Sequence, residues 1–340
     1  MQVIVPAAGL STRFPNMRPK YTLTDYQGRF MIQRAIERLD AADKIYIGVL
    51  AEHHAAYPID QRLQEIYGDR VEMIVLPERT LGPADTAQQI MERADLDSSQ
   101  GLLIKDCDSF FDHDHDEGNY VCVSSVADHD VIKRLAAKSF VRCNDQDIVT
   151  DIIEKQVVSD LFCVGGYHFR TPDLFREAYR ELDMGDHEIF VSHVIQRLLE
   201  QGEIFLSRRV RDYVDVGTAA DWQEYNDKSV IFCDIDGTLV HAQPQDGYHE
   251  PAVPLMKNLD RLLTLQSQGH QFVFTTARPK ESDHYTHAML TRLGFRDYEL
   301  VSGLLNARRI LINDYNDANP WPRAEAINLR RDDDRLGDFL

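Results

Sequence analysis

The stretch VIFCDIDGTLV has the residue types and the spacing for phosphate chemistry. It places Asp234 and Asp236 one residue apart, directly after an apolar run. A carboxylate at the end of a strand can attack phosphorus. A second carboxylate two positions on lies on the same side of an extended chain, where it can act as acid and base on the leaving oxygen. Gly237 lets the chain turn sharply after the strand. The stretch therefore predicts an aspartate that accepts a phosphoryl group.

A second stretch, VPAAGLSTRFPNMRPKY, has the composition of a phosphate-binding loop and follows the first apolar run. Its small residues let backbone N–H groups approach a triphosphate; they are Ala7, Ala8, Gly9, Ser11 and Thr12. Arg13 and Lys20 add cations that suit phosphate oxygens. The loop has neither the GKS or GKT of a P-loop nor the GxGxxG of a dinucleotide fold. It predicts a nucleotide site of another kind.

The elements that must position these residues follow an α/β pattern. Apolar runs such as QVIVPA and KIYIGVL alternate with stretches such as FMIQRAIERL, which has apolar residues at helical spacing. This alternation predicts a largely parallel sheet. Residues 120–170 hold several strand patterns with little helix between them, as expected for an antiparallel excursion on the same sheet.

The alternation of strands and helices restarts after residue 227. The strand SVIFCDID precedes a helix, the strand QFVFTTAR, a second helix and the strand RRILINDY. This order predicts a compact βαβαβ unit. We therefore expect two Rossmann-like domains, 1–227 with a mixed sheet and 228–340 with a smaller one. The charged tail RRDDDRLGDFL is predicted to be a solvated end.

Composition limits the classes of partner. The 340 residues are enough for two domains, and 37 Lys plus Arg against 56 Asp plus Glu give a formal charge of −19, which disfavours nucleic acid and anionic membranes. The five cysteines are scattered without a CxxC pair, as expected for buried thiols in a reducing cytosol. No apolar run approaches the ~20 residues of a bilayer span, and MQVIVPAAG lacks a basic n-region. We expect a cytoplasmic protein without a membrane partner; an oligomer is possible.

Over residues 1–225 the sequence resembles the sugar-phosphate nucleotidylyltransferases. The motifs are the opening loop with Pro19 and Lys20, then LGPADTA, KDCDSFF, IIEK, VGGYHF and YVDVGTAADW. The loop departs from the family at Leu10 and Ser11, where a second glycine is usual. By resemblance, the site residues are Gly82 and Asp85 for the base, Asp108 and Asp215 for the metal, and Glu154, Lys155, Gly166 and Tyr167 for the sugar phosphate. KDCDSFF also places Asp106 at the same strand end.

The resemblance implies Mg²⁺-dependent attack of an acceptor phosphate on the α-phosphorus of a nucleoside triphosphate. Such a reaction brings two anions together, so positioning and charge neutralisation dominate the barrier. Arg13 and Lys20 would stabilise the departing pyrophosphate. The acceptor is expected to be a small phosphorylated molecule, and the resemblance favours CTP slightly over UTP or dTTP.

The second half resembles the haloacid dehalogenase-like hydrolases. DIDGT matches their first motif, FTTAR offers Thr276, with Thr275 as second choice, and ILINDYND offers Asp314 as the Mg²⁺ ligand beside Asp234 and Asp236. The family's usual Lys is replaced by Arg308 or Arg309, and we take Arg309 as the catalytic cation. Asp317 would support Asp314.

The spacing between the motifs of the second half leaves no room for a cap domain, because each gap is mostly filled by one helix. The loop HAQPQDGYHEP is the one stretch long enough to fold over the opening, with Tyr248 or His249 toward substrate.

Together the resemblances imply a fused nucleotidylyltransferase and phosphatase of the kind associated with bacterial capsule or surface-polysaccharide synthesis. The alternative is a phosphatase alone, with the first domain kept as a nucleotide-sensing or scaffolding module; the irregular GLSTR loop motivates it. A third interpretation, a non-enzymatic structural partner of a polysaccharide assembly complex, would not explain why two complete sets of acidic residues are present. The tract FDHDHDEG could hold a metal, but a solvated turn explains its composition better.

Overall fold

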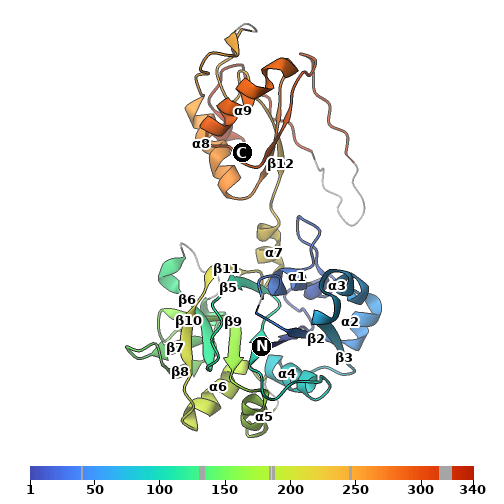
Figure 1. Cartoon of the computed structure of the whole chain (residues 1–340), viewed down its shortest axis with the longest axis vertical. Helices are drawn as coiled ribbons and strands as arrows, with labels where there is room; N and C mark the ends of the chain where they lie inside the picture. Colours follow the sequence, from blue (N-terminus) through green and yellow to red (C-terminus); the bar gives the residue numbers. More distant parts are fainter. Residues whose placement is uncertain (40, 130–134, 184, 186–187, 245–246, 314–323) are drawn as a thin grey trace. The chain divides into compact units, whose positions relative to one another are not determined.

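The computed structural model describes residues 1–39, 41–129, 135–183, 185, 188–244, 247–313 and 324–340. The chain divides into two compact units, Met1–Asn226 and Asp227–Leu340, which are treated one at a time below (Figure 1). Within the described ranges, no helix has both the length and the apolar composition needed to cross a membrane.

The first unit is built on a large mixed sheet. Its strand order is β10-β6-β9-β4-β1-β2-β3, with β7 and β8 attached at β9. The bounds are β1 Gln2–Pro6, β2 Lys44–Leu50, β3 Val71–Leu76, β4 Leu102–Lys105, β6 Tyr120–Ser125, β7 Phe140–Cys143, β8 Val149–Ile153, β9 Leu161–Phe169 and β10 Leu206–Arg209. Strands β1 to β4 pair in parallel, whereas β9 is antiparallel to β4, β6 and β7. The predicted antiparallel excursion within residues 120–170 is confirmed.

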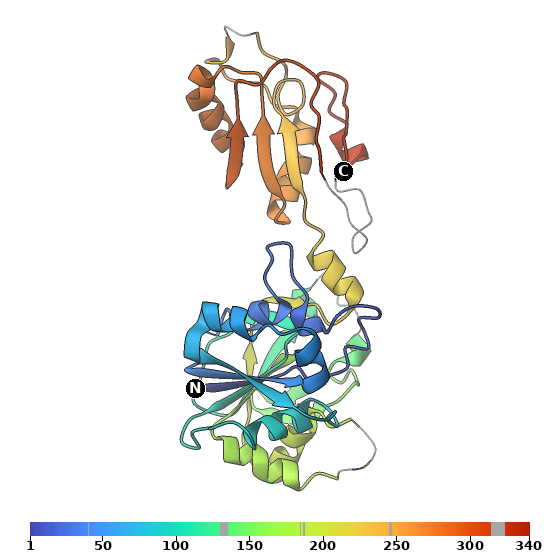
Figure 2. The ribbon, with the colours of Figure 1, turned by 90° about the vertical axis from the view of Figure 1, so that its right-hand side faces the viewer.

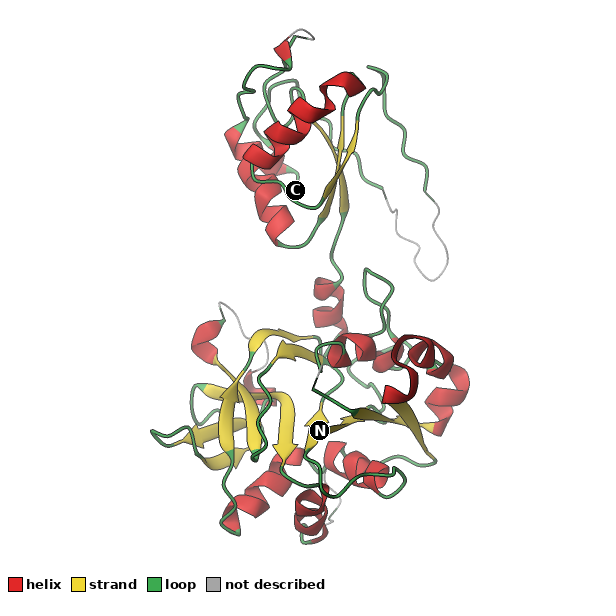
Figure 3. Ribbon diagram, in the orientation of Figure 1, coloured by secondary structure: helices red, strands yellow, loops and turns green. Residues whose placement is uncertain are grey.

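Helices cover both faces of this sheet (Figures 1 and 3). The α-helices of the unit are α1 Met31–Ile36, α2 Ala51–Ala56, α3 Asp60–Tyr67, α4 Pro83–Met91, α5 Pro172–Arg180, α6 Val191–Glu200 and α7 Ala219–Tyr225. Because side chains alternate along a strand, Val3 and Val5 pack with α1 and α3, while Ile4 packs with α4, α5 and α6. The sheet thus has a hydrophobic core on each face.

A short ribbon beside the sheet joins distant parts of the chain. Strand β5, Ser109–Asp112, pairs antiparallel with β11, Arg211–Asp215, and Ser109 lies opposite Asp215. The ribbon therefore places Asp215 next to the turn that follows β4. Helix α7 begins after this ribbon with Thr218 as its N-cap, whose side chain accepts a hydrogen bond from the backbone N–H of Asp221.

The second unit holds three parallel strands in the order β12-β13-β14 (Figure 2). Its elements are β12 Val230–Asp234, α8 Met256–Ser267, β13 Gln271–Thr275, α9 Asp283–Arg292 and β14 Tyr298–Val301. Phe272 and Phe274 pack with both helices in one core, whereas Val230 and Phe232, on the alternate face of β12, are 51% and 53% exposed. Each crossover contains one α-helix, and the described residues hold no inserted cap.

Short 3-10 helices complete the described secondary structure. They are Lys20–Thr22, Gly68–Arg70, Val126–Asp128, Leu135–Ala137, Lys280–Ser282 and Leu336–Asp338.

Two expectations for the second unit are corrected by the structure. The predicted strand RRILINDY spans residues 308–315; residues 314 and 315 lie outside the described residues, and residues 308–313 form no strand, with Ile310 and Ile312 67% and 91% exposed. An apolar, β-branched run favours extended backbone, but a strand also needs a neighbour to pair with. Most of the tail RRDDDRLGDFL is exposed as predicted, but Leu336 is 5% exposed and belongs to the core of the unit. Within this charged segment, the apolar side chain of Leu336 holds the tail to the core.

Candidate active sites

The first candidate site forms where β4 ends. Lys20 Nζ donates to Asp108 Oδ2 at 2.7 Å, and Arg13 Nη2 lies 3.4 Å from the same oxygen. Burial disfavours the charged carboxylate, but Lys20 and Arg13 outweigh it and hold the pKa of Asp108 well below its usual range. Burial alone would lower the pKa of Lys20, yet Asp108 raises it above its ordinary value. The predicted loop cations and the predicted metal carboxylate therefore meet.

Asp215 reaches the same place from β11. Lys138 Nζ donates to Asp215 Oδ2 at 2.6 Å, and the backbone N–H of Gly217 donates to Asp215 Oδ1 at 2.9 Å. A Cβ on Gly217 would lie 3.0 Å from Asp215 Oδ1 and 3.3 Å from both Asp108 Oδ2 and Arg13 Nη1. The two carboxylates thus converge on one small space. Lys138 was missed in the sequence, because no motif marks a lysine that approaches from another element.

This space fits a magnesium ion. Mg²⁺ is commonly held by one or two carboxylates, with substrate phosphates and water supplying the other oxygens. Asp108 and Asp215 provide two such carboxylates, and no larger cluster of three or more metal-binding side chains occurs among the described residues. A bound ion would neutralise charge on the phosphates, and the glycine at position 217 leaves the room for it.

A buried lysine fixes the turn that carries Asp108. Lys105 is fully buried, and its Nζ donates to the carbonyl oxygens of Asp106 at 2.8 Å and Ser109 at 2.6 Å. Burial lowers the pKa of Lys105 to about 8. Burial, followed by the nearby Asp108 charge, raises the pKa of Asp106 to about 6. Asp106 faces Gly165, where a Cβ would lie 2.4 Å from its Oδ2.

The predicted phosphate loop lines a cavity of about 360 Å³. Ala7 and Ala8 are buried, whereas a Cβ on Gly9 would meet nothing within 4 Å. Ser11 has a φ of 52°, and its Oγ accepts from the backbone N–H of Lys20 at 3.0 Å, which ties the two ends of the loop together. Thr12 is exposed and lines the cavity with Ser11. His53 and Tyr57, from α2 and its end, also line it and were not singled out in the sequence.

The loop LGPADTA, predicted to contact the base, is held in its conformation by the side chain of Asp85. Asp85 accepts from the backbone N–H of Leu81 at 2.7 Å and from Tyr179 Oη at 2.8 Å. Gly82 has a φ of 138°, and a Cβ there would lie 2.6 Å from the carbonyl oxygen of Ile189. Both residues therefore have a role in the loop's conformation, and the loop begins helix α4.

The predicted acidic and basic sugar-phosphate residues lie at the end of β8. Glu154 Oε2 accepts from Ser192 Oγ at 2.7 Å and from Ser139 Oγ. Lys155 has a φ of 55° and places its ammonium 4.1 Å from the centroid of the Phe190 ring. Glu154 is thus oriented by two hydroxyls, while the Lys155 side chain is half-exposed.

The other two predicted sugar-phosphate residues are enclosed within β9. A Cβ on Gly166 would lie 2.8 Å from the Phe111 ring and 3.0 Å from Cys122 Sγ, so packing requires glycine there. Tyr167 is 7% exposed, and burial raises its pKa well above the usual range.

The second candidate site forms where β12 ends. Thr276 Oγ1 lies 3.4 Å from Asp236 Oδ2, and Arg309 Nη2 lies 3.4 Å from Asp234 Oδ1. Burial raises the pKa of Asp234, while Arg309 opposes that shift. Thr276 is the threonine that contacts Asp236, while Thr275 lies opposite Asp234 in the pairing of β12 and β13. Among the described residues the oxygens for an ion are those of Asp234 and Asp236; the predicted ligand Asp314, with Asp317, lies outside the described residues.

Arg278 is a residue of this site to which the sequence interpretation gave no role. Its side chain is 1% exposed and contacts Asp236 twice, from Nε at 2.9 Å and Nη2 at 2.7 Å. Nη2 also donates to Gln243 Oε1 at 3.1 Å, and the guanidinium lies 4.7 Å from the Tyr248 ring centroid. A basic residue two positions after Thr276 was the available signal. Tyr248 therefore lies near the carboxylates, as expected for the long loop.

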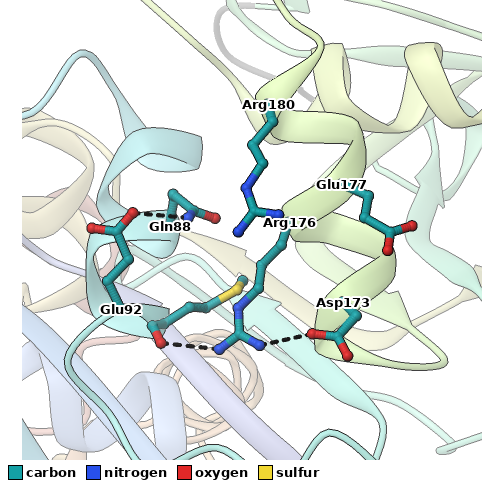
Figure 4. A pocket seen from close by; sticks show the side chains of 7 residues that line it. Gln88, Glu92, Asp173, Arg176, Glu177 and Arg180 are labelled. Carbon is teal, nitrogen blue, oxygen red and sulfur yellow. Dashed lines mark hydrogen bonds and ion pairs between the residues drawn. The ribbon is translucent and has the colours of Figure 1, made fainter.

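Another cavity, of about 300 Å³, lies between α4 and α5 and contains no predicted site residue (Figure 4). Arg176 donates to Asp173 at 2.8 Å and to the carbonyl oxygen of Met91 at 3.0 Å, and Gln88 donates to Glu92 at 3.0 Å. The full lining is Gln88, Met91, Glu92, Asp173, Arg176, Glu177 and Arg180. The bond from Arg176 to Met91 joins the two helices, which pack on the sheet face opposite α1 and α3.

The tract FDHDHDEG is mostly exposed or partly exposed, as expected for a solvated turn, and several of its side chains contact other residues. Asp114 and Asp116 face Arg211 and Arg208. His115 makes an edge contact with His168, which itself stacks on Tyr120. The metal interpretation therefore has no support in this tract.

Comparisons with known proteins agree with this architecture. Residues 231–295 match the family model of the haloacid dehalogenase-like hydrolases, a segment that includes Asp234, Asp236, Thr276 and Arg278. No curated protein matches the sequence significantly.

Solved structures similar to this chain match its first two thirds. A nucleoside-diphosphate-sugar pyrophosphorylase from Vibrio cholerae RC9 is 18% identical, with a TM-score of 0.57 over 65% of this chain and 98% of its own. The inositol-1-phosphate CTP transferase from T. maritima is 16% identical, with a TM-score of 0.54 over 65% and 90%. An apo UDP-glucose pyrophosphorylase is 16% identical, with a TM-score of 0.51 over 66% and 95%. The chain therefore combines a nucleotidyltransferase-like fold with a haloacid dehalogenase-like region, and these matches support its assignment as an enzyme.

Proposed function

We propose that the chain is a bifunctional enzyme. The first unit transfers a nucleotidyl group from a nucleoside triphosphate to a small phosphorylated acceptor and releases pyrophosphate. The second unit hydrolyses a phosphate monoester through an aspartyl phosphate. The observation that carries the proposal is the convergence of Asp108 and Asp215 on one point beside Arg13, a geometry that suits a metal ion between two phosphates.

For the transfer step, an oxygen of the acceptor phosphate attacks the α-phosphorus, and the bond to the pyrophosphate oxygen breaks. Arg13 and Lys20, which contact Asp108 in the free protein, would stabilise negative charge on the departing pyrophosphate. Magnesium would supply charge neutralisation across the two phosphates. Lys20 and Lys138 hold the carboxylates ready, which reduces the reorganisation needed when substrate binds.

For hydrolysis, an oxygen of Asp234 attacks the phosphorus, and Asp236 gives a proton to the departing alcohol. Asp236 then takes a proton from the water that attacks the aspartyl phosphate, so inorganic phosphate leaves and Asp234 is restored. Arg278 orients Asp236 by its paired contacts, and Arg309 offers positive charge beside Asp234.

The substrates rest on resemblance more than on the site. The likeness to the T. maritima CTP transferase supports CTP slightly over UTP or dTTP, and the sugar pyrophosphorylases support a sugar phosphate or similar acceptor. A role in capsule or surface-polysaccharide precursor synthesis, in the cytoplasm, is the context we infer for two such activities on one chain.

The first test follows thermal unfolding of the full chain with Mg²⁺ and each of CTP, UTP, dTTP, ATP and GTP. A triphosphate at about 100 times its dissociation constant should stabilise the native state by roughly 2.7 kcal/mol. The triphosphate that raises Tm then enters an assay of pyrophosphate release with sugar phosphates as acceptors. Asp108→Asn should lose that release and keep phosphatase activity.

The alternative is that only the phosphatase is active and the first unit senses nucleotides or acts as a scaffold. Leu10 and Ser11, which make the loop bulkier, motivate it, and Ser11 adopts a φ of 52°. The alternative predicts that no triphosphate and acceptor pair releases pyrophosphate, and that Asp108→Asn changes no activity.

A further inference from the structure

The C-terminal tail is fastened to the loop that follows Asp236. The backbone N–H of Asp332 donates to the carbonyl oxygen of Gly237 at 2.9 Å, and Asp332 Oδ1 accepts from the backbone N–H of Ala242 at 2.9 Å. These bonds attach the tail to both ends of the turn that begins at Gly237. The tail therefore lies against the loop that directly follows Asp236.

A buried asparagine holds the next part of the tail. Asn258, on α8, is fully buried, and its Nδ2 donates to the carbonyl oxygens of Thr238 and Asp333, both at 2.8 Å. Its Oδ1 accepts from the backbone N–H of Leu336 at 3.0 Å. One side chain thus joins the site loop, helix α8 and the tail, so the position of residues 332–336 is set by the folded unit.

This attachment brings Arg331 across Gly237. A Cβ on Gly237 would lie 2.9 Å from Arg331 Cγ, and Gly237 has a φ of 89°. Gly237 is therefore needed for its backbone conformation and also because the Arg331 stem passes over it. Arg331 is exposed, and its side chain passes over the turn that directly follows Asp236.

The negative charge of the substrate and of the site carboxylates indicates a role for Arg331. A phosphate monoester is a dianion, and it must approach the carboxylates of Asp234 and Asp236. Arg278 is already engaged twice by Asp236. Among the described residues, Arg309 contacts Asp234 at 3.4 Å, and the stem of Arg331 lies over Gly237, next to Asp236 in the chain. Both are exposed enough to meet a ligand.

We propose that Arg331, carried by the fastened tail, binds a non-bridging oxygen of the substrate phosphate in the second site. This inference rests on the proposed phosphatase function. It assigns to the tail a part in substrate binding, and it pairs Arg331 with Arg309 as the two arginines for the phosphate group.

The test uses the full chain with Mg²⁺ and p-nitrophenyl phosphate, and compares Arg331→Gln with Arg330→Gln. Arg330 is the neighbouring exposed arginine of the same tail, so both variants lose one positive charge at adjacent positions. Arg331→Gln should raise KM and the inhibition constant of inorganic phosphate about tenfold, with kcat changed much less. Arg331→Lys should restore part of the loss, and Arg330→Gln should match the unaltered protein. Unchanged Tm values verify folding.

A second measurement separates this inference from the phosphatase proposal. Titration calorimetry gives the affinity for inorganic phosphate without any turnover. The proposed phosphatase function fails if Asp234→Asn hydrolyses p-nitrophenyl phosphate as fast as the unaltered protein, or if the unaltered protein does not hydrolyse it. A weaker phosphate affinity in Arg331→Gln alone would then still support the contact. Equal phosphate affinity in Arg331→Gln and Arg330→Gln overturns the inference, whatever the hydrolysis assay shows.

Discussion

Gly9 and Gly166 were both predicted to contact ligands, but the folded chain gives them different reasons to be glycine. Gly9 has no positive φ, and a Cβ there would meet nothing within 4 Å, so neither conformation nor packing requires glycine. A Cβ on Gly166 would lie 2.8 Å from the Phe111 ring. Glycine at position 166 is explained by the core, whereas for position 9 we propose that a ligand approaches the backbone.

This difference predicts opposite results for two alanine substitutions. Gly166→Ala should destabilise the first unit by about 1–3 kcal/mol, because the strand or the ring must move. Gly9→Ala should leave the free energy of unfolding within about 0.5 kcal/mol and weaken triphosphate binding. Urea unfolding and triphosphate titration measure the two effects. A stable Gly9→Ala variant with unchanged triphosphate affinity would contradict the loop's assignment.

Arg278 gives a second prediction at this scale. Lysine cannot make the paired contact that guanidinium makes with both oxygens of Asp236. Arg278→Lys should therefore lower kcat for p-nitrophenyl phosphate at least about tenfold with little change in KM, because Arg278 acts through Asp236. Arg292→Lys, an exposed arginine on α9, is the matched control. A proportional rise in KM would instead indicate direct substrate contact.

Among individual residues, the sequence predicted those in short motifs and missed those that arrive from elsewhere. Asp108 and Asp215 were paired on resemblance, and the fold brings them to one point. Lys138 joins Asp215 across 77 positions of sequence, and its neighbours carry no motif. Arg331 likewise reaches the second site only because the tail is held there. A single sequence does not encode such contacts in a readable local pattern.

At the scale of elements, the histidines beside β6 and β9 should make the first unit sensitive to acid. Burial lowers the pKa of His168 and of His113 to about 4. His168 Nδ1 bonds to the carbonyl oxygen of Gly118 at 2.7 Å, and the ring stacks on Tyr120. An unfolded histidine binds its proton near pH 6.5. The unfolded state therefore binds more protons than the native state between pH 6.5 and 4, so stability falls as the pH drops through that window.

Urea unfolding at pH 7 and pH 5 measures this loss. His168 should contribute about 2 kcal/mol of the difference, from a shift that begins at pH 6.5. His168→Phe keeps a ring on Tyr120, and although it loses the bond to Gly118, it should show a smaller drop between the two pH values. His249→Gln, at an exposed position, should show the original drop. Equal pH dependence in His168→Phe and the unaltered protein would refute the assignment.

Periodicity predicted most of the elements, and it failed where pairing or anchoring decides the outcome. The alternation of Val3, Ile4 and Val5 between two cores follows directly from the strand period. Residues 308–313 have the same apolar character but no strand. The tail departs from its pattern in the opposite way: its sequence is charged, yet Leu336 and bonds to Asn258 attach it to the folded unit. Both failures concern partners distant in sequence, which local patterns do not specify.

At the scale of the whole molecule, each unit carries its own acid set with its own cations. Asp108 pairs with Lys20 and Asp215 with Lys138 in the first unit, and Asp234 pairs with Arg309 in the second. With a formal charge of −19, the chain is acidic overall, so anionic substrates depend on these local cations. When no metal is bound, the same cations offset the negative charge of the carboxylates.

This pairing predicts that metal removal stops catalysis without unfolding the chain. EDTA should abolish both activities, and Mg²⁺ should restore them, because the ion neutralises phosphate charge in each reaction. Without nucleotide, Tm in EDTA and in Mg²⁺ should differ by less than about 4 °C, since a metal worth less than about 1 kcal/mol to the native state shifts the Tm of a domain of about 150–250 residues by no more than about 2–4 °C. A triphosphate should enhance Mg²⁺ binding, because its oxygens complete the ligand set that two carboxylates leave open. A large rise of Tm with Mg²⁺ alone would mean instead that Lys20 and Lys138 do not stand in for the ion, and that the carboxylates form a structural metal site.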